Sequence, residues 1–150
     1  RRSILNTLRT VSLLLPALIF SACGTAEIVP VAIEDHDMCS FCRMAISEKE
    51  FAAEIIATDE KVYKFDDVGC MLKFAKNEGD ALKPAAIFVT DFDSRQWIKA
   101  HDAFFVKTGS IKTPMSGGLI PFADKAKADA FAASSGSTVM RFNGLSVPEH

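Results

Sequence analysis

Short apolar blocks separated by polar residues follow one another along the chain after residue 50, and they predict strands. Residues 51–58 and 61–65 are rich in apolar and β-branched side chains and flank a polar two-residue turn, which predicts a β-hairpin. A capping box at 47–50 makes a helix the alternative for the first block, but the adjacent Ile55 and Ile56 favour a strand. Further strands are predicted for 84–90, for 96–107 as one long strand or two short ones, and for 138–142.

Two other blocks have the three-to-four-residue period of an amphipathic helix. The first begins at the capping pair Asp66-Asp67 and runs through Glu78, and the second runs from residue 124 to residue 135. Each block is followed by a glycine, Gly79 or Gly136, which is typical of a helix end. A glycine-rich loop at 108–118 lies between the predicted strand region 96–107 and the second helix.

The two helical blocks resemble each other in sequence. Residues 64–79 and 121–136 align without gaps and share five identities in sixteen positions. The identities fall at a strand end, a helix N-cap, a core position and a helix end; they are Phe65/Phe122, Asp67/Asp124, Phe74-Ala75/Phe131-Ala132 and Gly79/Gly136. Chance similarity of two capped helices is the alternative. We predict an α+β domain of two ββα-type halves, about 38–90 and 91–150, which share a mainly antiparallel sheet and contain two principal helices.

The first 22 residues have the order typical of a secretory signal peptide. Arginines precede an apolar run at 11–20, which is shorter than the roughly 20 residues needed to span a bilayer, and small residues follow it. Ser21-Ala22-Cys23 resembles the lipobox of bacterial lipoproteins, whose cysteine is acylated and becomes the new N-terminus. An uncleaved helical anchor is the alternative. We predict lipidation at Cys23, a tether at 23–37 and a folded domain at 38–150, on the periplasmic face of a bacterial membrane, inner or outer.

The overall charge limits the classes of partner. Seventeen basic and nineteen acidic residues give a net charge of −2, which argues against a nucleic-acid partner because phosphate binding requires a basic surface. No paired carboxylates, nucleophile–base pair or phosphate-binding loop is evident in the sequence, so we do not expect an enzyme. Apolar residues make up 49% of the chain, with twelve phenylalanines, which is sufficient for a core without disulfides.

Sulfur-containing side chains are concentrated in the stretch DMCSFCRM at residues 37–44. Thiolates and thioethers are soft donors, and soft donors favour Cu(I). A further methionine, Met115, lies in the glycine-rich loop, where few apolar neighbours account for it. We therefore predict a Cu(I) site formed by Cys39, Cys42, Met44 and Met115, with Met38 as a weaker candidate. Met71 and Met140 lie on predicted apolar faces and are assigned to the core.

Three other interpretations of the cysteines stay open. Zinc would require Cys39, Cys42, Cys70 and one of two histidines, His36 or His101, to come together; Cys70 is otherwise a core residue. A redox-active dithiol normally opens a helix after a hydrophobic strand, whereas polar residues precede Cys39 here. A structural disulfide between Cys39 and Cys42 would close a very short loop and so constrain the unfolded chain little.

Several segments resemble the NosL family of copper-binding lipoproteins that are accessory to nitrous-oxide reductase. They are the cysteine segment at 39–46, the segment KVYKFDDVGCM at 61–71 and the methionine-containing segment TPMSGGLIPF at 113–122. Arg43 is a departure, because many family members have glycine between the second cysteine and the methionine. The resemblance implies a duplicated ββα fold and delivery of Cu(I) for the copper–sulfur centre of that reductase in denitrification, or for another copper enzyme. It also implies docking to an ABC-transporter maturation complex. A zinc-stabilised interaction module and a periplasmic thiol-disulfide oxidoreductase are the alternative functions.

Overall fold

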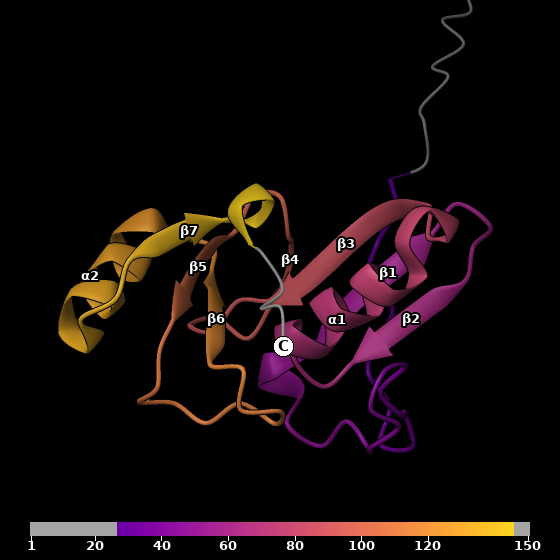
Figure 1. Ribbon diagram of the computed structural model, residues 1–150, viewed down its shortest axis with the longest axis horizontal. Helices are drawn as coiled ribbons and strands as arrows, with labels where there is room; N and C mark the ends of the chain where they lie inside the picture. Colours follow the sequence, from indigo (N-terminus) through magenta and orange to yellow (C-terminus); the bar gives the residue numbers. More distant parts are fainter. Residues whose placement is uncertain (1–26, 146–150) are drawn as a thin grey trace, which may run out of the picture.

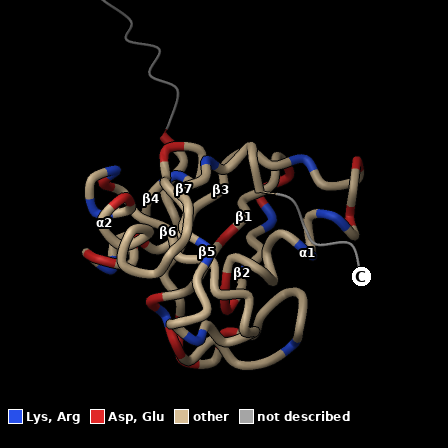
Figure 2. Tube along the Cα trace, turned by 60° about the vertical axis from the view of Figure 1, so that its left-hand side comes forward, with Lys and Arg blue, Asp and Glu red and all other residues tan. Residues whose placement is uncertain are grey.

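The computed structural model describes residues 27–145 (Figure 1). The predicted signal peptide and the predicted lipidation site at Cys23 lie outside these residues. None of the helices in the described part has the length and apolar character needed to cross a membrane. In Figure 2 acidic and basic residues are interspersed over the loops and helices of the described chain.

The strands of the described residues form two separate antiparallel sheets. The first has the order β2-β1-β3-β4 and the second has the order β6-β5-β7. Their bounds are β1 Ala53–Ala57, β2 Val62–Phe65, β3 Pro84–Thr90, β4 Trp97–Lys99, β5 Phe104–Lys107, β6 Leu119–Phe122 and β7 Val139–Arg141. The predicted α+β class is confirmed, but the expectation of one shared sheet was wrong.

The division into two sheets occurs inside the predicted strand region 96–107. A tight turn follows β4, in which the Ala103 amide donates to the Ala100 carbonyl at 3.3 Å. Both alanines are fully buried, so the turn itself is part of the interior. The chain therefore leaves the first sheet after β4 and enters the second as β5, and the apolar pattern alone could not distinguish this from one long strand.

Each half contains the same order of elements. The first half runs β1-β2-α1-β3 and the second β5-β6-α2-β7, where α1 is Val68–Glu78 and α2 is Lys125–Ser135. In both halves the first strand is central and is flanked by the second strand and by the strand after the helix. The internal sequence similarity therefore has a structural counterpart, a repeated ββαβ unit, to which β4 is added in the first half.

The helices begin and end at the residues that the sequence indicates. Asp67 accepts a hydrogen bond from the Cys70 amide at 2.8 Å, and Asp124 accepts one from the Lys127 amide at 3.0 Å, so both are side-chain N-caps. Both helices end at glycines with positive φ. The predicted capping box yields only a 3-10 turn, Lys49–Phe51, before β1, and the strand interpretation of that block is confirmed.

Aromatic side chains join each helix to its sheet. Phe74 of α1 lies 4.8 Å from Tyr63 and 5.2 Å from Phe65, measured between ring centroids, and so packs on one face of the first sheet. In the second half, Phe131 of α2 lies 5.3 Å from Phe122 of β6. These contacts hold the middle of each helix against the strand that precedes it.

The other face of the first sheet is crossed by residues 27–37, which we call the strap (Figure 1). Beneath the strap, four residues are successive cross-strand partners and therefore share one face; they are Lys64, Glu54, Phe88 and Lys99. The strap contacts three of them: Glu27 pairs with Lys99 at 3.1 Å, the Val31 amide donates to Glu54 at 2.9 Å, and Lys64 donates to the Ala32 carbonyl at 2.7 Å. The described part of the predicted tether thus lies across the sheet and leads directly into the cysteine segment.

Candidate metal centre

Cys39 and Cys42 lie in a small hairpin formed by residues 38–45. Met38 and Ala45 form an isolated antiparallel bridge at its base. Within it the Cys39 amide donates to the Met44 carbonyl at 2.8 Å, and the Arg43 amide donates to the Cys39 carbonyl at 3.0 Å. The hairpin fixes the separation of the two cysteines before any metal is bound.

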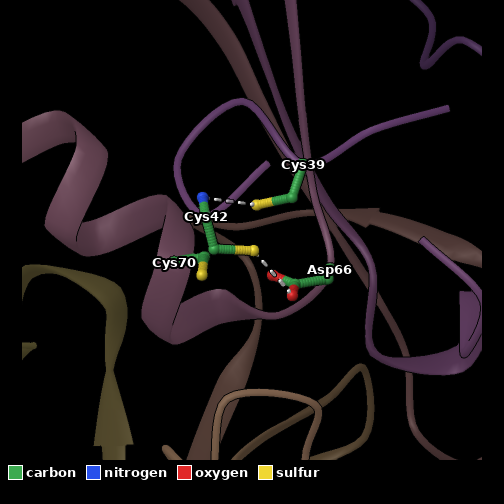
Figure 3. Close-up of side chains that lie close together, drawn as sticks. All are labelled: Cys39, Cys42, Asp66 and Cys70. Atoms are coloured by element: carbon green, nitrogen blue, oxygen red, sulfur yellow. Dashed lines mark hydrogen bonds between the residues drawn. The ribbon is translucent and has the colours of Figure 1, made fainter. Parts of the chain in front are cut away.

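The segment that joins β2 to α1 brings two further donors to the hairpin. The sulfur atoms of Cys39, Cys42 and Cys70 and a carboxylate oxygen of Asp66 all lie within 4.8 Å of one another. Figure 3 shows these four side chains close together. The Cys42 thiol donates to Asp66 Oδ2 at 3.2 Å, and the Cys42 amide donates to Cys39 Sγ at 3.5 Å. We call these four residues the cysteine centre.

Most of the cysteine centre is shielded from water. Cys39, Cys70 and Asp66 are buried, with at most 3% of their surfaces exposed, whereas Cys42 is half-buried. A hydrogen bond from the Cys70 thiol lowers the pKa of Cys39 to about 6. Burial raises the pKa of Cys42 to about 11, and the hydrogen bond to Cys39 raises the pKa of Cys70 well above its usual range. Cys39 therefore holds the thiolate, and Cys42 is the thiol nearest to solvent.

The methionine-containing loop is bound to the same helix start. Asp67 Oδ2 accepts hydrogen bonds from Thr113 Oγ1 at 2.9 Å and from the Met115 amide at 3.1 Å, while Oδ1 caps the Cys70 amide. Met115 is half-buried and packs against the core cluster that contains Cys39 and Cys70. One carboxylate thus fixes both Cys70 and the main chain of Met115.

The four predicted ligands occupy different environments. Cys39 and Cys42 lie together in the cysteine centre, and Met115 lies in the loop bound to the start of α1. Met44 and Met38 have 58% and 53% of their surfaces exposed, on the outside of the hairpin. Met38 and Met44 therefore lie at the surface, whereas Met115 and the thiols lie closer to the core.

Asp66 was not predicted as a ligand from the sequence, and Cys70 was predicted only as a zinc ligand or a core residue. Asp66 and Asp67 were both explained by helix capping, but only Asp67 caps the helix, which leaves the Asp66 side chain directed at the cysteines. The available signal was the spacing: a cap at Asp67 places Cys70 in the first turn, beside the cap. Among the described residues, the group of candidate donors includes neither His36, which is exposed, nor His101, which packs against Phe142.

Comparison with known proteins agrees with this geometry. Residues 30–148 match the NosL family. The chain belongs to the NosL family. A relative from Stutzerimonas stutzeri named copper-binding lipoprotein NosL is 30% identical over 138 residues, which cover 83% of this chain and 73% of the relative.

The NosL fold is also recovered by comparison with solved structures. The crystal structure of the copper chaperone NosL from Shewanella denitrificans matches with a TM-score of 0.71 and 23% identity. The match covers 79% of this chain and 96% of that chain. The predicted family and the two-helix, antiparallel α+β fold are thus confirmed.

The departure from the NosL pattern at Arg43 has a structural cost. Arg43 has a φ of 64°, in the left-handed region that glycine adopts without strain. A glycine at this position would suit the turn between Cys42 and Met44. This chain keeps the same turn with a strained arginine.

Proposed function

We propose that this NosL-family protein is a Cu(I) metallochaperone that binds its cargo through Cys39 and Cys42, with Met44 and Met115 as thioether donors. The observation that best supports this proposal is that three sulfur atoms lie close together at the start of α1, to which the Met115 loop is also bound. Soft donors of this kind select Cu(I) over harder ions. The names of the two NosL relatives, a copper-binding lipoprotein and a copper chaperone, support copper as the cargo.

The arrangement suits transfer by stepwise ligand exchange. Exposed Met44 and half-buried Cys42 are the first donors that an incoming ion meets, and buried Cys39 supplies the thiolate. Binding to Cys42 requires loss of its proton, and Asp66 already accepts a hydrogen bond from that thiol. Cys70 and Asp66 are additional donors. A recipient can displace these ligands one at a time, so the ion is never free in solution.

The proposed client is nitrous-oxide reductase, whose copper–sulfur centre needs Cu(I) during assembly, or another copper enzyme. We infer that the mature chain is anchored by a lipid on Cys23 to the periplasmic face of a bacterial membrane, inner or outer. An ABC-transporter maturation complex is the proposed docking partner there. The lipoprotein name of the Stutzerimonas stutzeri relative supports the anchor. No catalytic role is proposed.

A zinc-stabilised interaction module is the second candidate. Cys39, Cys42, Cys70 and Asp66 together offer four donors, the number that a tetrahedral structural zinc site requires. In that case the methionines would be dispensable, and chelation would unfold the domain. A thiol-disulfide oxidoreductase is disfavoured, because Cys39 has no exposed surface and lies in a hairpin rather than at a helix start.

The deciding experiment is an anaerobic titration of the reduced mature chain with Cu(I) against a competing chelator, with Zn(II) in parallel. We expect a one-to-one Cu(I) complex that is weakened about 100-fold or more by Cys39→Ser and less by Met115→Leu. Met140→Leu, in β7, is the matched methionine control and should bind as the unaltered protein does. Tighter binding of Zn(II) than of Cu(I) would overturn the proposed function, and unchanged binding in Cys39→Ser would overturn the proposed ligands.

A further inference from the structure

Lys64, in β2, lies where the strap, the cysteine hairpin and the first sheet meet. Its ammonium donates to the Ala32 carbonyl of the strap at 2.7 Å and pairs with Asp37 at 2.6 Å. Its main chain binds Ser40, whose amide donates to the Lys64 carbonyl at 2.7 Å and whose hydroxyl accepts from the Lys64 amide at 3.2 Å. One residue therefore holds three segments of the chain.

Asp37 connects the Lys64 side chain to the base of the hairpin. The Asp37 carbonyl accepts a hydrogen bond from the Ile46 amide at 3.0 Å, directly next to the bridge between Met38 and Ala45. Only 15% of the Lys64 side chain and 20% of the Asp37 side chain are exposed. An ion pair this sheltered is screened less by water and salt than the exposed pairs elsewhere on the surface. The pair therefore restrains the base of the hairpin.

Lys64 is also close in sequence to the other two donors of the cysteine centre. It precedes Asp66 by two residues in the same segment, and Asp66 leads into the helix that carries Cys70. Lys64 thus lies between the hairpin that carries Cys39 and Cys42 and the segment that carries Asp66 and Cys70. The Lys64 ammonium itself donates to Ala32 and to Asp37, which lie outside the cysteine centre.

The neighbouring strap contact uses only one oxygen of a buried carboxylate. Glu54, the cross-strand partner of Lys64, accepts from the Val31 amide through Oε1, but its buried Oε2 has no hydrogen-bond partner. Within the described residues, the ammonium of Lys64 makes the only two side-chain hydrogen bonds from β2 to the strap.

We propose that Lys64 is a positioning residue for the cysteine centre, holding the hairpin that carries Cys39 and Cys42 against the segment that carries Asp66 and Cys70. Its role in copper exchange rests on the proposed function. Without the ammonium, the base of the hairpin opens more often, and a bound ion loses its hairpin ligands sooner. Outer-shell groups of this kind typically change metal affinity by about 10- to 100-fold.

The experiment compares Lys64→Met with Lys99→Met in the mature chain. Lys99 lies in the same row beneath the same strap and loses the same charge, but its pair with Glu27 is exposed and lies at the far end of the strap. The first measurement, on the metal-free protein, is amide hydrogen exchange at Cys39 and Arg43, whose amides close the hairpin. The second measurement is the rate of Cu(I) release to a chelator.

Lys64→Met should speed exchange of the hairpin amides and Cu(I) release by about tenfold, whereas Lys99→Met should leave both within about twofold. Lys64→Arg should restore most of the slow release. Asp37→Asn removes the same pair from the other side and should reproduce Lys64→Met. Ile120→Val, in the second core cluster, serves as a control for lost stability and should not speed hairpin exchange selectively.

Equal behaviour of the Lys64→Met and Lys99→Met variants would overturn the proposal, as would release rates that only follow melting temperature across all variants. The exchange measurement needs no metal. If the unaltered chain fails to bind Cu(I), the proposed function fails, and the hairpin amides alone decide the role of Lys64.

Discussion

Helices α1 and α2 begin alike, each with an aspartate N-cap after a strand, but only the start of α1 carries a candidate site. Asp67 binds the Cys70 amide and also Thr113 and Met115 of a distant loop, whereas the Asp124 side chain binds only the Lys127 amide and is exposed. The position of Cys70 in α1 is occupied by Lys127 in α2. The repeated ββαβ unit therefore gives each half a capped helix, but a candidate site forms only in the first half, where other segments of the chain contact the helix start.

The connections between the first two strands of each half show where those surroundings arise. In the first half the connection is short, residues 58–61, whereas in the second half it spans residues 108–118. The longer loop reaches from the second half to Asp67 in the first half and brings Met115 there (Figure 1). The hairpin at 38–45 precedes the first repeated unit. The candidate site thus depends on two additions to the repeated units: the hairpin before the first unit and the long loop within the second.

The two halves also use one equivalent position differently. Glu54 faces Lys64 across β1 and β2, and in the aligned second half Phe105 faces Pro121 across β5 and β6. Phe105 packs into the main core cluster, whereas Glu54 is covered by the strap and leaves one oxygen unpaired. Glu54 thus gives the strap a hydrogen-bond acceptor, but it also buries a carboxylate oxygen that has no hydrogen-bond partner.

The largest expected difference between the halves concerns the two caps. Asp67→Ala removes three hydrogen bonds to a buried carboxylate and should lower the free energy of unfolding by about 3 kcal/mol or more. Asp124→Ala removes one cap and should cost about 1 kcal/mol. Urea denaturation of the metal-free reduced protein measures both. Equal losses would show that the Met115 loop contributes little to stability.

The second test concerns the long loop of the second half. Gly118 has a φ of 59°, and a Cβ there would lie 2.0 Å from the Thr108 carbonyl oxygen. Gly118→Ala should cost about 2–4 kcal/mol, because strain and overlap add. Gly136→Ala has a similar φ of 64° but no neighbour within 4 Å, and should cost about 1 kcal/mol. Thermal denaturation separates the two, and similar losses would mean that the loop shifts freely.

The third test relieves strain beside the cysteines. Arg43→Gly should raise the free energy of unfolding by about 0.5–1 kcal/mol, since glycine adopts the positive φ without strain. Glu60→Gly, at a φ of 66° in the short connection of the first half, is the matched control for the backbone effect. Chemical denaturation gives both values. A loss of stability in Arg43→Gly alone would show that the arginine side chain makes a compensating contact.

The smallest expected effect is the pH dependence of Glu54. Burial raises the pKa of this carboxyl above 4.5, so the folded chain holds a proton that the unfolded chain releases. Stability linked to the neutral carboxyl is present below about pH 4.5 and declines as the pH rises through the raised pKa. Glu54→Gln cannot ionise, so its stability relative to the unaltered chain should increase from pH 4.5 to pH 7. A constant difference from urea denaturation across that range would contradict this, and Glu60→Gln serves as an exposed control.

Local sequence signals predicted the elements that short-range physics controls. The caps at Asp67 and Asp124 and the glycines after each helix set the helix bounds. The hydrophobic pattern located the strands to within one or two residues at most ends, except β6, for which no strand was predicted. The soft-donor cluster also identified Cys39 and Cys42 as a pair. The split of 96–107 between two sheets could not be predicted, because the same apolar pattern fits either arrangement.

By itself, the sequence determined the duplicated capped helices, the pairing of Cys39 with Cys42 as candidate ligands, and the family. Tertiary structure alone decided that Cys70 and Asp66 join Cys39 and Cys42, and that the Met115 loop is bound to the helix that carries Cys70. The physical reason is the range of the forces involved. Caps, turns and periodicity act between residues a few positions apart, whereas the cysteine centre depends on packing between segments separated by 24 or more residues.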